Sequence, residues 1–450
     1  MSHTYVIDVS SLKKEKPQPD RVPMFTRTEE SFTKFRAGNI EFYYSNFDNG
    51  IYDINKNPLS EVAVEDELYR EVISETRSRL KSDKPFWIRI LLGHACNYSC
   101  SYCMQKDIGN PDERAKISTT DKFIEQLSSL DMSRLQKIDL WGGETLLYWK
   151  TIVEIMTTFD REGLTWYIPT NGTPLLMKHV EFFSTLKSEV TIGISHDGPG
   201  QEELRGEEFL HKKMEVLRAL QQTPNVQFSF NPVVSHNNFD LFKINKFFYD
   251  YCIEAGLDYT KIGISWTLGH NHDYTNTQNS ALHVIHGDNL GKFKTIIEEY
   301  MAKNVEQYYK NIDHKLMQSN LFEGGMGVLP YVKTLRKQIL PTSTTSCGVD
   351  DEGVLSVDMA GNVRTCPHTD ISFVGGHIED LKNVKLKRID LERYEKHCGS
   401  CEVYRLCKSN CPIDVPDDVF YTNCAVEKVY NRAIQNTAFR LIFGNEVVKE

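Results

Sequence analysis

Three cysteines stand close together in the stretch Gly93-His94-Ala95-Cys96-Asn97-Tyr98-Ser99-Cys100-Ser101-Tyr102-Cys103, which directly follows an apolar run at 87–92. Their C-x3-C-x2-C spacing lets three thiolates of one loop hold three corners of a cubane iron–sulfur cluster and leaves the fourth iron without a protein ligand. Zinc is the alternative, although it normally takes a fourth protein ligand, for which His94 is the nearby candidate. The stretch therefore indicates a metal-binding loop at the end of a strand.

Apolar, strand-like runs alternate with longer helical patterns from residue 86 onwards. This alternation predicts an α/β fold with a parallel sheet and crossover helices. About six such units form a partial (β/α)6, TIM-like barrel, whose chemistry is expected at the carboxyl ends of the strands. The predicted strands are Trp87–Leu92, Ile138–Trp141, Thr165–Pro169, Val190–Ser195, Val226–Val234 and Ile262–Thr267.

Short polar motifs follow three of these strands. Gly142-Gly143-Glu144 combines glycines, which let the backbone approach a ligand closely, with a carboxylate that can accept from an ammonium group. Thr170-Asn171-Gly172 and Ser195-His196-Asp197-Gly198-Pro199 offer small polar side chains that suit ribose hydroxyls or a carboxylate. Each motif is also an ordinary turn signal, so a purely structural role stays open.

Ten of the eleven cysteines fall into two blocks, and clustered cysteines in a protein without a secretory signal point to metal or catalysis. Cys252 stands apart in the helical pattern Phe239–Ala255, and we expect it to be a small buried residue. The C-x2-C pair in the second block is also common in zinc ribbons, which remain an alternative. The second block comprises Cys347, Cys366, Cys398, Cys401, Cys407, Cys411 and Cys424, with Gly361 between the first two.

The first block resembles the signature of the radical S-adenosylmethionine (radical SAM) superfamily, which has this spacing and an aromatic residue, here Tyr102, before the last cysteine. The resemblance implies that the open iron chelates the methionine moiety and that reduction releases a 5′-deoxyadenosyl radical. It also implies cofactor-binding roles for the strand-end motifs and for Arg205 as a candidate carboxylate partner. These residues are Tyr102, Gly142, Gly143, Glu144, Thr170, Asn171, Ser195, Asp197 and Arg205.

The second block is similar, cysteine for cysteine, to the SPASM domain that follows radical SAM domains in peptide-modifying and sulfatase-maturing enzymes. That family assigns Cys398, Cys401, Cys407 and Cys424 to a distal auxiliary cluster, and Cys347, Cys366 and Cys411 to a proximal one. The resemblance thus implies three 4Fe-4S clusters, one radical SAM and two auxiliary. No further cysteine precedes Cys347 in 341–346, so the fourth proximal ligand stays open between a vacant iron, Asp350, Asp351 and a substrate group.

These patterns divide the chain into an N-terminal extension at 1–85, a radical SAM domain at 86–325, a linker at 326–345 and a SPASM domain at 346–450. The extension contains Asp48-Asn49-Gly50 between apolar runs, which predicts a hairpin, and then a helical pattern at 59–80. A second hairpin is expected around Ala360-Gly361, in a loop-rich block with little apolar core that would need metal to hold it.

The net charge of −10, without a Lys/Arg block, argues against nucleic acid as the main partner. No apolar run reaches the ~18 residues of a membrane helix, and a secretory signal is absent, so a cytoplasmic location is expected. The predicted partners are a peptide or protein substrate and an external electron donor of the flavodoxin or ferredoxin type.

The resemblance implies hydrogen abstraction from a peptide, and the leading hypothesis is maturation of a ribosomally made peptide through a thioether, a carbon–carbon crosslink or a related modification. A sulfatase-maturing, formylglycine-forming enzyme is the alternative, although Pro367 stands where that family has an aspartate. A non-catalytic iron–sulfur or zinc scaffold is the alternative of another class. The catalytic residues stay unknown, with His196, His368 and Asp370 as candidates.

Overall fold

The computed structural model describes most of the chain. The described residues are 31–59, 80–103, 105, 117–270, 283–309, 328–337, 350–364, 374–386, 389–407, 415–444 and 447–449. Among them, no helix is long and apolar enough to cross a membrane.

A nine-stranded sheet is the centre of the described fold, in the order β10-β8-β7-β6-β5-β4-β12-β13-β14. From β10 to β4 every neighbouring pair is parallel, which confirms the predicted α/β class. The parallel strands are β4 (Trp87–Leu91), β5 (Lys137–Trp141), β6 (Thr165–Thr170), β7 (Glu189–Ile194), β8 (Val226–Phe230) and β10 (Gly263–Ile264).

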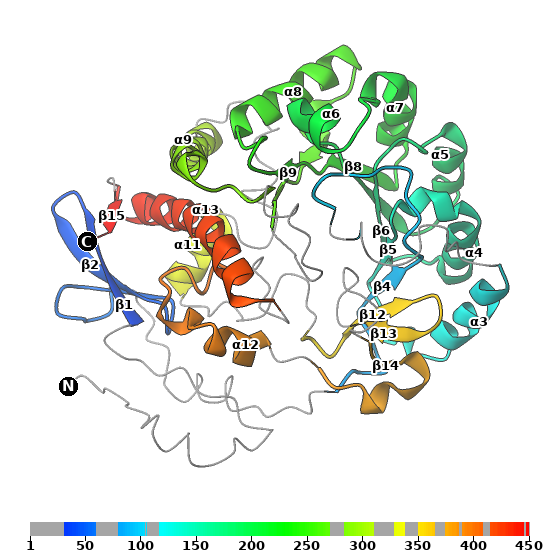
Figure 1. The fold of residues 1–450 in the computed structure, drawn as a ribbon, viewed down its shortest axis with the longest axis horizontal. Helices are drawn as coiled ribbons and strands as arrows, with labels where there is room; N and C mark the ends of the chain where they lie inside the picture. Colours follow the sequence, from blue (N-terminus) through cyan, green and yellow to red (C-terminus); the bar gives the residue numbers. More distant parts are fainter. Residues whose placement is uncertain are drawn as a thin grey trace.

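Helices connect these strands and lie along the outer side of the curved sheet (Figure 1). Their apolar faces and the strands share one core, which includes Trp166, Phe183 and Phe248. Cys252 is fully buried in this core on α8, as predicted, and burial raises the pKa of its thiol to about 12. The helices are α3 (Ile117–Ser128), α4 (Trp149–Phe159), α5 (Met177–Phe183), α6 (Gln201–Leu204), α7 (Met214–Gln222), α8 (Leu241–Glu254) and α9 (Asp288–Tyr309).

Two predicted strands are each divided in two, namely Val226–Val234 and Ile262–Thr267, and the second of these forms β10 and then β11 (Thr267–Leu268). The run Val226–Val234 forms β8 and then β9 (Val233–Val234), and Pro232 lies between them. A proline has no amide hydrogen to donate to a ladder, so the strand is interrupted there. Beyond the break, β9 pairs in parallel with β11 in a separate small sheet.

The hairpin expected around Ala360-Gly361 is present as β12 (Val354–Asp358) and β13 (Asn362–Arg364), followed by β14 (Val374–His377). However, β12 also pairs in parallel with β4 over five residues, so the hairpin extends the main sheet. Leu355, Val357 and Val363 are part of the main core. The expectation of a block with little apolar core is therefore wrong for this hairpin, because strand pairing carries it into the large core.

The N-terminal hairpin is confirmed: β2 (Ile40–Ser45) and β3 (Gly50–Tyr52) are antiparallel, and Asn49 has a positive φ of 56° at the turn. Together with β1 (Phe32–Ala37) and β15 (Val447–Lys449) they form a sheet that packs on α13 (Asp417–Phe443) through Phe42 and Phe439. The helical pattern at 59–80 lies outside the described residues except at its two ends. Figure 1 places this sheet and α13 on the side away from α3–α5.

Two further helices complete the described C-terminal part, namely α11 (Val328–Lys337) and α12 (Ile389–Glu395). The long helix α13 contacts both α9 and α11. It thereby joins the last part of the chain to the parallel-sheet domain.

Candidate active site

A cavity of about 550 Å³ lies where the carboxyl ends of the parallel strands meet. Its wall is built from the cysteine loop after β4, from the segments after β5, β6 and β7, and from the chain around β9 and β11. Of the predicted cofactor-binding residues, all but Asp197 line it. They are Tyr102, Gly142, Gly143, Glu144, Thr170, Asn171, Ser195 and Arg205.

The cysteine loop is held against the end of β5 by backbone contacts. The amide of Gly143 donates to the carbonyl of Gly93 at 2.9 Å, and the amide of Glu144 donates to the carbonyl of Ala95 at 2.8 Å. A Cβ atom at Gly143 would lie 2.3 Å from the carbonyl oxygen of His94. The glycine is therefore needed here for two loops of the chain to meet, a reason that the sequence did not indicate.

Tyr148 also contacts the cysteine loop. Its hydroxyl accepts from the amide of Ala95 at 2.8 Å. A Cβ atom at Gly93 would lie only 2.4 Å from the same hydroxyl oxygen, so a side chain there would collide with Tyr148. Gly93 also has a φ of +150°. Sequence reasoning missed Tyr148, because nothing in the run Leu146–Tyr148 distinguishes it from the apolar start of a helix.

All three thiols of the loop line the cavity, with Cys96 and Cys103 exposed and Cys100 half-buried. Burial raises the pKa of the Cys96 and Cys100 thiols. Three free thiols that share one loop and one cavity fit the predicted cubane cluster, which takes one thiolate at each of three corners. Among the described residues, no three His, Cys, Asp or Glu side chains lie close enough together to bind a single metal ion.

Glu144 is 1% exposed and its carboxylate is fixed by protein donors. One oxygen accepts from the Thr170 hydroxyl at 2.6 Å and from the amide of Leu146 at 2.9 Å, and the other accepts from the amide of Asn171 at 2.6 Å. Burial raises the pKa of this carboxyl, and these hydrogen bonds oppose the rise. Since an ionised carboxylate has about four acceptor positions, three protein donors leave room for one more donor from the cavity.

Asn171 connects the third strand end to the cysteine loop. Its side-chain amide donates to Oδ1 of Asn97 at 2.8 Å, and the Asn97 amide in turn donates to the Thr173 hydroxyl at 2.8 Å. Asn97 lies directly after Cys96, so the strand-end motif positions the loop that carries the thiols.

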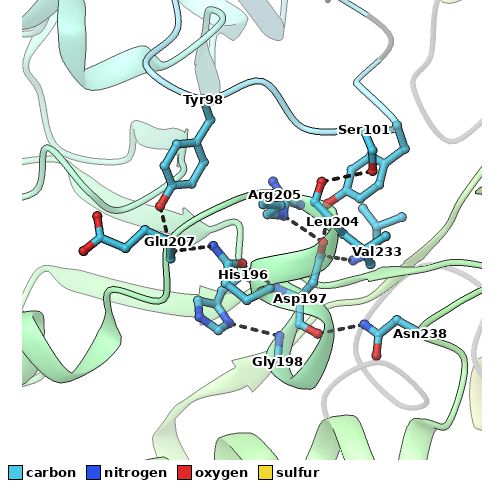
Figure 2. A network of polar contacts seen from close by, with 12 residues as sticks. Tyr98, Ser101, His196, Asp197, Gly198, Leu204, Arg205, Glu207, Val233 and Asn238 are labelled. Atoms are coloured by element: carbon cyan, nitrogen blue, oxygen red, sulfur yellow. Dashed lines mark hydrogen bonds and ion pairs between the residues drawn. The ribbon is translucent and has the colours of Figure 1, made fainter. Parts of the chain in front are cut away.

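Asp197 is fully buried and faces other residues of the chain (Figure 2). One carboxylate oxygen accepts from the amide of Val233 at 2.8 Å, while the other accepts from the Tyr102 hydroxyl and lies 3.1 Å from Nε of Arg205. Burial alone would lower the pKa of Arg205, but the Asp197 carboxylate raises it above its ordinary value. The guanidinium therefore stays charged at the cavity wall. Asp197 holds Tyr102 and Arg205 in place.

The cysteine loop also rests on the segment around α6 (Figure 2). The amide and hydroxyl of Ser101 both donate to the carbonyl of Leu204, and the Tyr98 hydroxyl donates to the carbonyl of Glu207 at 2.9 Å. The loop is thus anchored on both sides, by Gly143 and Tyr148 on one and by α6 on the other.

His196, a candidate catalytic residue, does not line the described cavity. It is fully buried, stacks on Phe247 and accepts from the amide of Gly198 through Nδ1, while Nε2 lies 3.2 Å from Glu208 (Figure 2). Burial lowers the pKa of His196. The other two candidates, His368 and Asp370, lie outside the described residues.

The described part of the second block contains four free cysteines, which are the four assigned to the distal cluster by resemblance. Cys398 lies on the turn η11 (Cys398–Ser400), and Cys401 directly follows that turn. Cys407 lies six residues further along the chain, and Cys424 lies on α13. Burial raises the pKa of Cys424, and the thiol of Cys401 raises it further, so these two are neighbours. Cys347, Cys366 and Cys411 lie outside the described residues.

Sequence reasoning also missed His270 and Glu427. His270 lines the cavity, and its Nε2 lies 2.8 Å from Oε1 of Glu427 on α13. His270 shares one signal with the strand-end motifs, because it too follows a strand end. Its partner stands 157 positions away, a separation at which sequence spacing carries no information.

Residues 90–231 match the family model described as the Radical SAM superfamily. The radical SAM cyclopropyl synthase TigE of Paramaledivibacter caminithermalis is 22% identical over 378 residues, which cover 77% of this chain and 72% of that protein. Among solved structures, native anSMEcpe with bound AdoMet and Cp18Cys peptide has a TM-score of 0.55 at 15% identity and covers 79% of this chain and 99% of that one. Streptococcus suis SuiB bound to S-adenosylmethionine has a TM-score of 0.50 at 14% identity, with coverages of 86% and 95%. At such identities the solved structures show the fold.

Proposed function

We propose that this chain, whose residues 90–231 match the Radical SAM superfamily model, is an enzyme that abstracts hydrogen from a ribosomally made peptide and installs a thioether, a carbon–carbon crosslink or a related modification. The observation that carries the proposal is the three-thiol loop at the carboxyl ends of the parallel strands, on the wall of a cavity of about 550 Å³.

The residues of this chain fit the cofactors that the family implies. Cys96, Cys100 and Cys103 would hold the radical SAM cluster. When bound, that cluster and S-adenosylmethionine supply reductive cleavage of the sulfonium and the hydrogen-abstracting species. The three thiols and the cofactor-binding candidates share one cavity, so both groups would be held side by side.

Each cavity residue has a role that its contacts suggest. The remaining acceptor position of Glu144 suits an ammonium group, and the charged guanidinium of Arg205 suits a carboxylate. The hydroxyl of Ser195 suits a ribose hydroxyl, and Thr170 and Asn171 add acceptor and donor positions that their contacts with Glu144 and Asn97 leave over. These roles orient the cofactor, while the loop contacts keep the cluster fixed relative to it.

A peptide substrate is supported by the relatives. The anSMEcpe structure was obtained with a bound peptide, and TigE is named as a cyclopropyl synthase. Formation of formylglycine on a sulfatase is the second candidate, favoured by the fold shared with anSMEcpe and disfavoured by Pro367, which stands where an aspartate is expected.

The auxiliary clusters are part of the proposal. Cys398, Cys401, Cys407 and Cys424 would hold the distal cluster, and Cys347, Cys366 and Cys411 the proximal one. With the radical SAM cluster they predict about twelve iron atoms per chain, if all three are cubane. A scaffold without catalysis predicts no cleavage of S-adenosylmethionine at all.

The test is anaerobic reconstitution followed by reduction with S-adenosylmethionine and the short peptide encoded next to the chain's gene. We expect 5′-deoxyadenosine together with a change in peptide mass. A sulfatase-derived peptide containing Cys or Ser serves as the second substrate and distinguishes the two candidates. Cofactor cleavage with both peptides unchanged would contradict the proposal, and absence of cleavage would favour the scaffold.

A further inference from the structure

The chain after β11 also lines the cavity, and it meets α13 there. His270 lies at this place, two residues after β11, and its side chain is 8% exposed. Nε2 of its ring lies 2.8 Å from Oε1 of Glu427. This contact joins the last described strand of the parallel-sheet domain to the helix that carries Cys424.

Glu427 is itself fixed in a buried position. It is 1% exposed, and its second carboxylate oxygen accepts from the side-chain amide of Asn431 at 2.9 Å. The same amide also donates to the carbonyl of Glu427 at 2.8 Å. A buried carboxylate without a positive or hydrogen-bonding partner is costly. The histidine and the glutamate therefore form a hydrogen-bonded unit at the cavity wall.

The other titratable groups on the described wall are engaged elsewhere. Glu144 already accepts from three protein donors, and Arg205 stays charged beside Asp197. The Tyr102 hydroxyl is held by Asp197, and that of Tyr98 donates to a backbone carbonyl.

His94 belongs to the cysteine loop, two residues before the first thiol that the cluster would take. Of the described side chains that line the cavity, His270 is thus the imidazole that belongs neither to the cysteine loop nor to the cofactor-binding motifs.

We propose that His270 is the general base and acid of the active site and that Glu427 is its positioning residue. The inference rests on the proposed function, since it assigns the proton transfer in a modification that deprotonates a heteroatom, such as the thiol that becomes a thioether. In this step the imidazole takes a proton from a heteroatom of the peptide. The heteroatom–hydrogen bond breaks with its electron pair left on the peptide, a nitrogen–hydrogen bond forms on the ring, and no electron is gained or lost by the protein.

The partnership explains why a buried histidine can take up this charge. A carboxylate at hydrogen-bond distance stabilises the imidazolium and fixes both the tautomer and the orientation of the ring. The carboxylate comes from α13 and the imidazole from the parallel-sheet domain, so the base is assembled only when the two parts are docked.

The first experiment compares His270→Gln with wild-type enzyme, using the peptide encoded next to the chain's gene. Loss of a general base typically slows a reaction by about 10²–10⁴-fold. We expect peptide modification to fall at least about 100-fold, while 5′-deoxyadenosine formation stays within a few-fold of wild type. Glu427→Gln should show the same uncoupling to a smaller degree. Peptide modification by His270→Gln at the wild-type rate would overturn the proposal.

A matched control exists on the surface. His211 lies 3.4 Å from Glu254, but both side chains are more than half exposed, at 56% and 59%. His211→Gln removes the same imidazole from a histidine–glutamate pair that is far less buried than His270 and Glu427. It should change neither 5′-deoxyadenosine formation nor peptide modification. Unfolding measured by circular dichroism shows whether His270→Gln is folded.

The second experiment needs no peptide and uses the reconstituted protein with S-adenosylmethionine bound. In His270→Gly the ring is deleted, and we expect added imidazole to bind beside Glu427, as followed by ligand-detected NMR. Adding Glu427→Gln to this variant should weaken imidazole binding at least tenfold. In the peptide assay, added imidazole should restore peptide modification by the His270→Gly enzyme. If the wild-type enzyme cleaves S-adenosylmethionine but modifies no peptide, the proposed function fails. In that case absence of imidazole binding would overturn the assignment of His270, and its presence would support it.

Discussion

The two cysteine-bearing regions are supported in different ways. The loop 93–103 lies at the carboxyl end of β4 and is fixed by Gly143, Tyr148, Asn171 and the segment at α6. The described cysteines of the second block lie on a short turn, in the loop after it and on α13. The first site is therefore part of the edge of the parallel sheet, while the second joins segments that come together from distant parts of the chain.

Support of the second region comes mainly from buried cations and backbone carbonyls. Arg393 is 2% exposed and donates to the carbonyl of Cys407 at 2.7 Å, and Arg405 donates to the carbonyl of Asn46 at 2.8 Å. Asn46 in turn donates to the carbonyls of Gly399 and Cys401. The N-terminal hairpin therefore holds the turn that carries Cys398 and leads into Cys401.

The largest expected effect comes from removing thiols of one region at a time. Cys96→Ala, Cys100→Ala and Cys103→Ala together should abolish formation of 5′-deoxyadenosine, because the predicted cluster would have no ligands. Cys398→Ala with Cys424→Ala should keep cofactor cleavage but lose peptide modification. The measurement is anaerobic mass spectrometry of both products. If the second pair also abolishes cleavage in folded protein, the two regions are not separable.

The next effect tests how tightly the first region is built. Gly143→Ala would place a Cβ atom 2.3 Å from the His94 carbonyl oxygen and 2.6 Å from that of Ala95, which are backbone atoms that cannot move away cheaply. We expect loss of the radical SAM cluster signal in electron paramagnetic resonance and a fall in cofactor cleavage of about 100-fold, roughly 2.7 kcal/mol.

The matched control for this variant is Gly291→Ala in α9, where nothing lies within 4 Å of the added Cβ atom. Gly291→Ala should leave the radical SAM cluster signal and the cleavage of S-adenosylmethionine unchanged, and it should slightly stabilise α9. Equal behaviour of the two variants would show that the close approach at Gly143 is not needed.

Acid should destabilise α5, the helix that follows β6 of the parallel sheet, through a buried histidine. His179 on α5 is 2% exposed, lies against Trp149 and accepts from the amide of Leu176, and burial lowers its pKa to about 4. In the unfolded chain it takes up a proton near pH 6.5, so the unfolded state binds more protons between pH 6.5 and 4. The contribution of His179 to the free energy of unfolding is therefore fully present above pH 6.5. As the pH falls towards 4, about 2–3 kcal/mol of this free energy is lost.

Urea unfolding at several pH values measures this loss, and hydrogen exchange locates it at α5. His179→Asn should flatten the dependence between pH 6.5 and 4. An unchanged slope in the variant would mean that other groups cause the loss.

The smallest expected effect concerns one hydrogen bond under the cysteine loop. Tyr148→Phe removes the hydroxyl that accepts from the amide of Ala95 and leaves that buried donor without its partner. We expect a loss of about 1–2 kcal/mol in stability and a small rise in the KM for S-adenosylmethionine. Thermal unfolding and steady-state kinetics check both. If Tyr148→Phe lowers cofactor cleavage as much as Gly143→Ala does, the hydroxyl matters as much to the loop as the close backbone approach.

Much of the parallel-sheet domain could be predicted because its signals are local. Each strand is a short apolar run, and each site motif follows a strand within a few residues, so the strands and the position of the site are predicted from the same spacing. The split of the run Val226–Val234 was missed, although Pro232 was visible, because a proline at the end of a strand is tolerated at many edges.

Spacing along the sequence determined the two cysteine blocks, the alternating strands and the edge of the sheet where the cavity lies, since these follow from periodicity over a few residues. Only the tertiary structure decided that β12 joins β4, that Asp197 holds Tyr102 and Arg205, and that His270 meets Glu427. The physical reason is that these contacts join residues up to 267 positions apart, such as Trp87 and Val354. Packing of whole elements brings such residues together, and no local pattern records it.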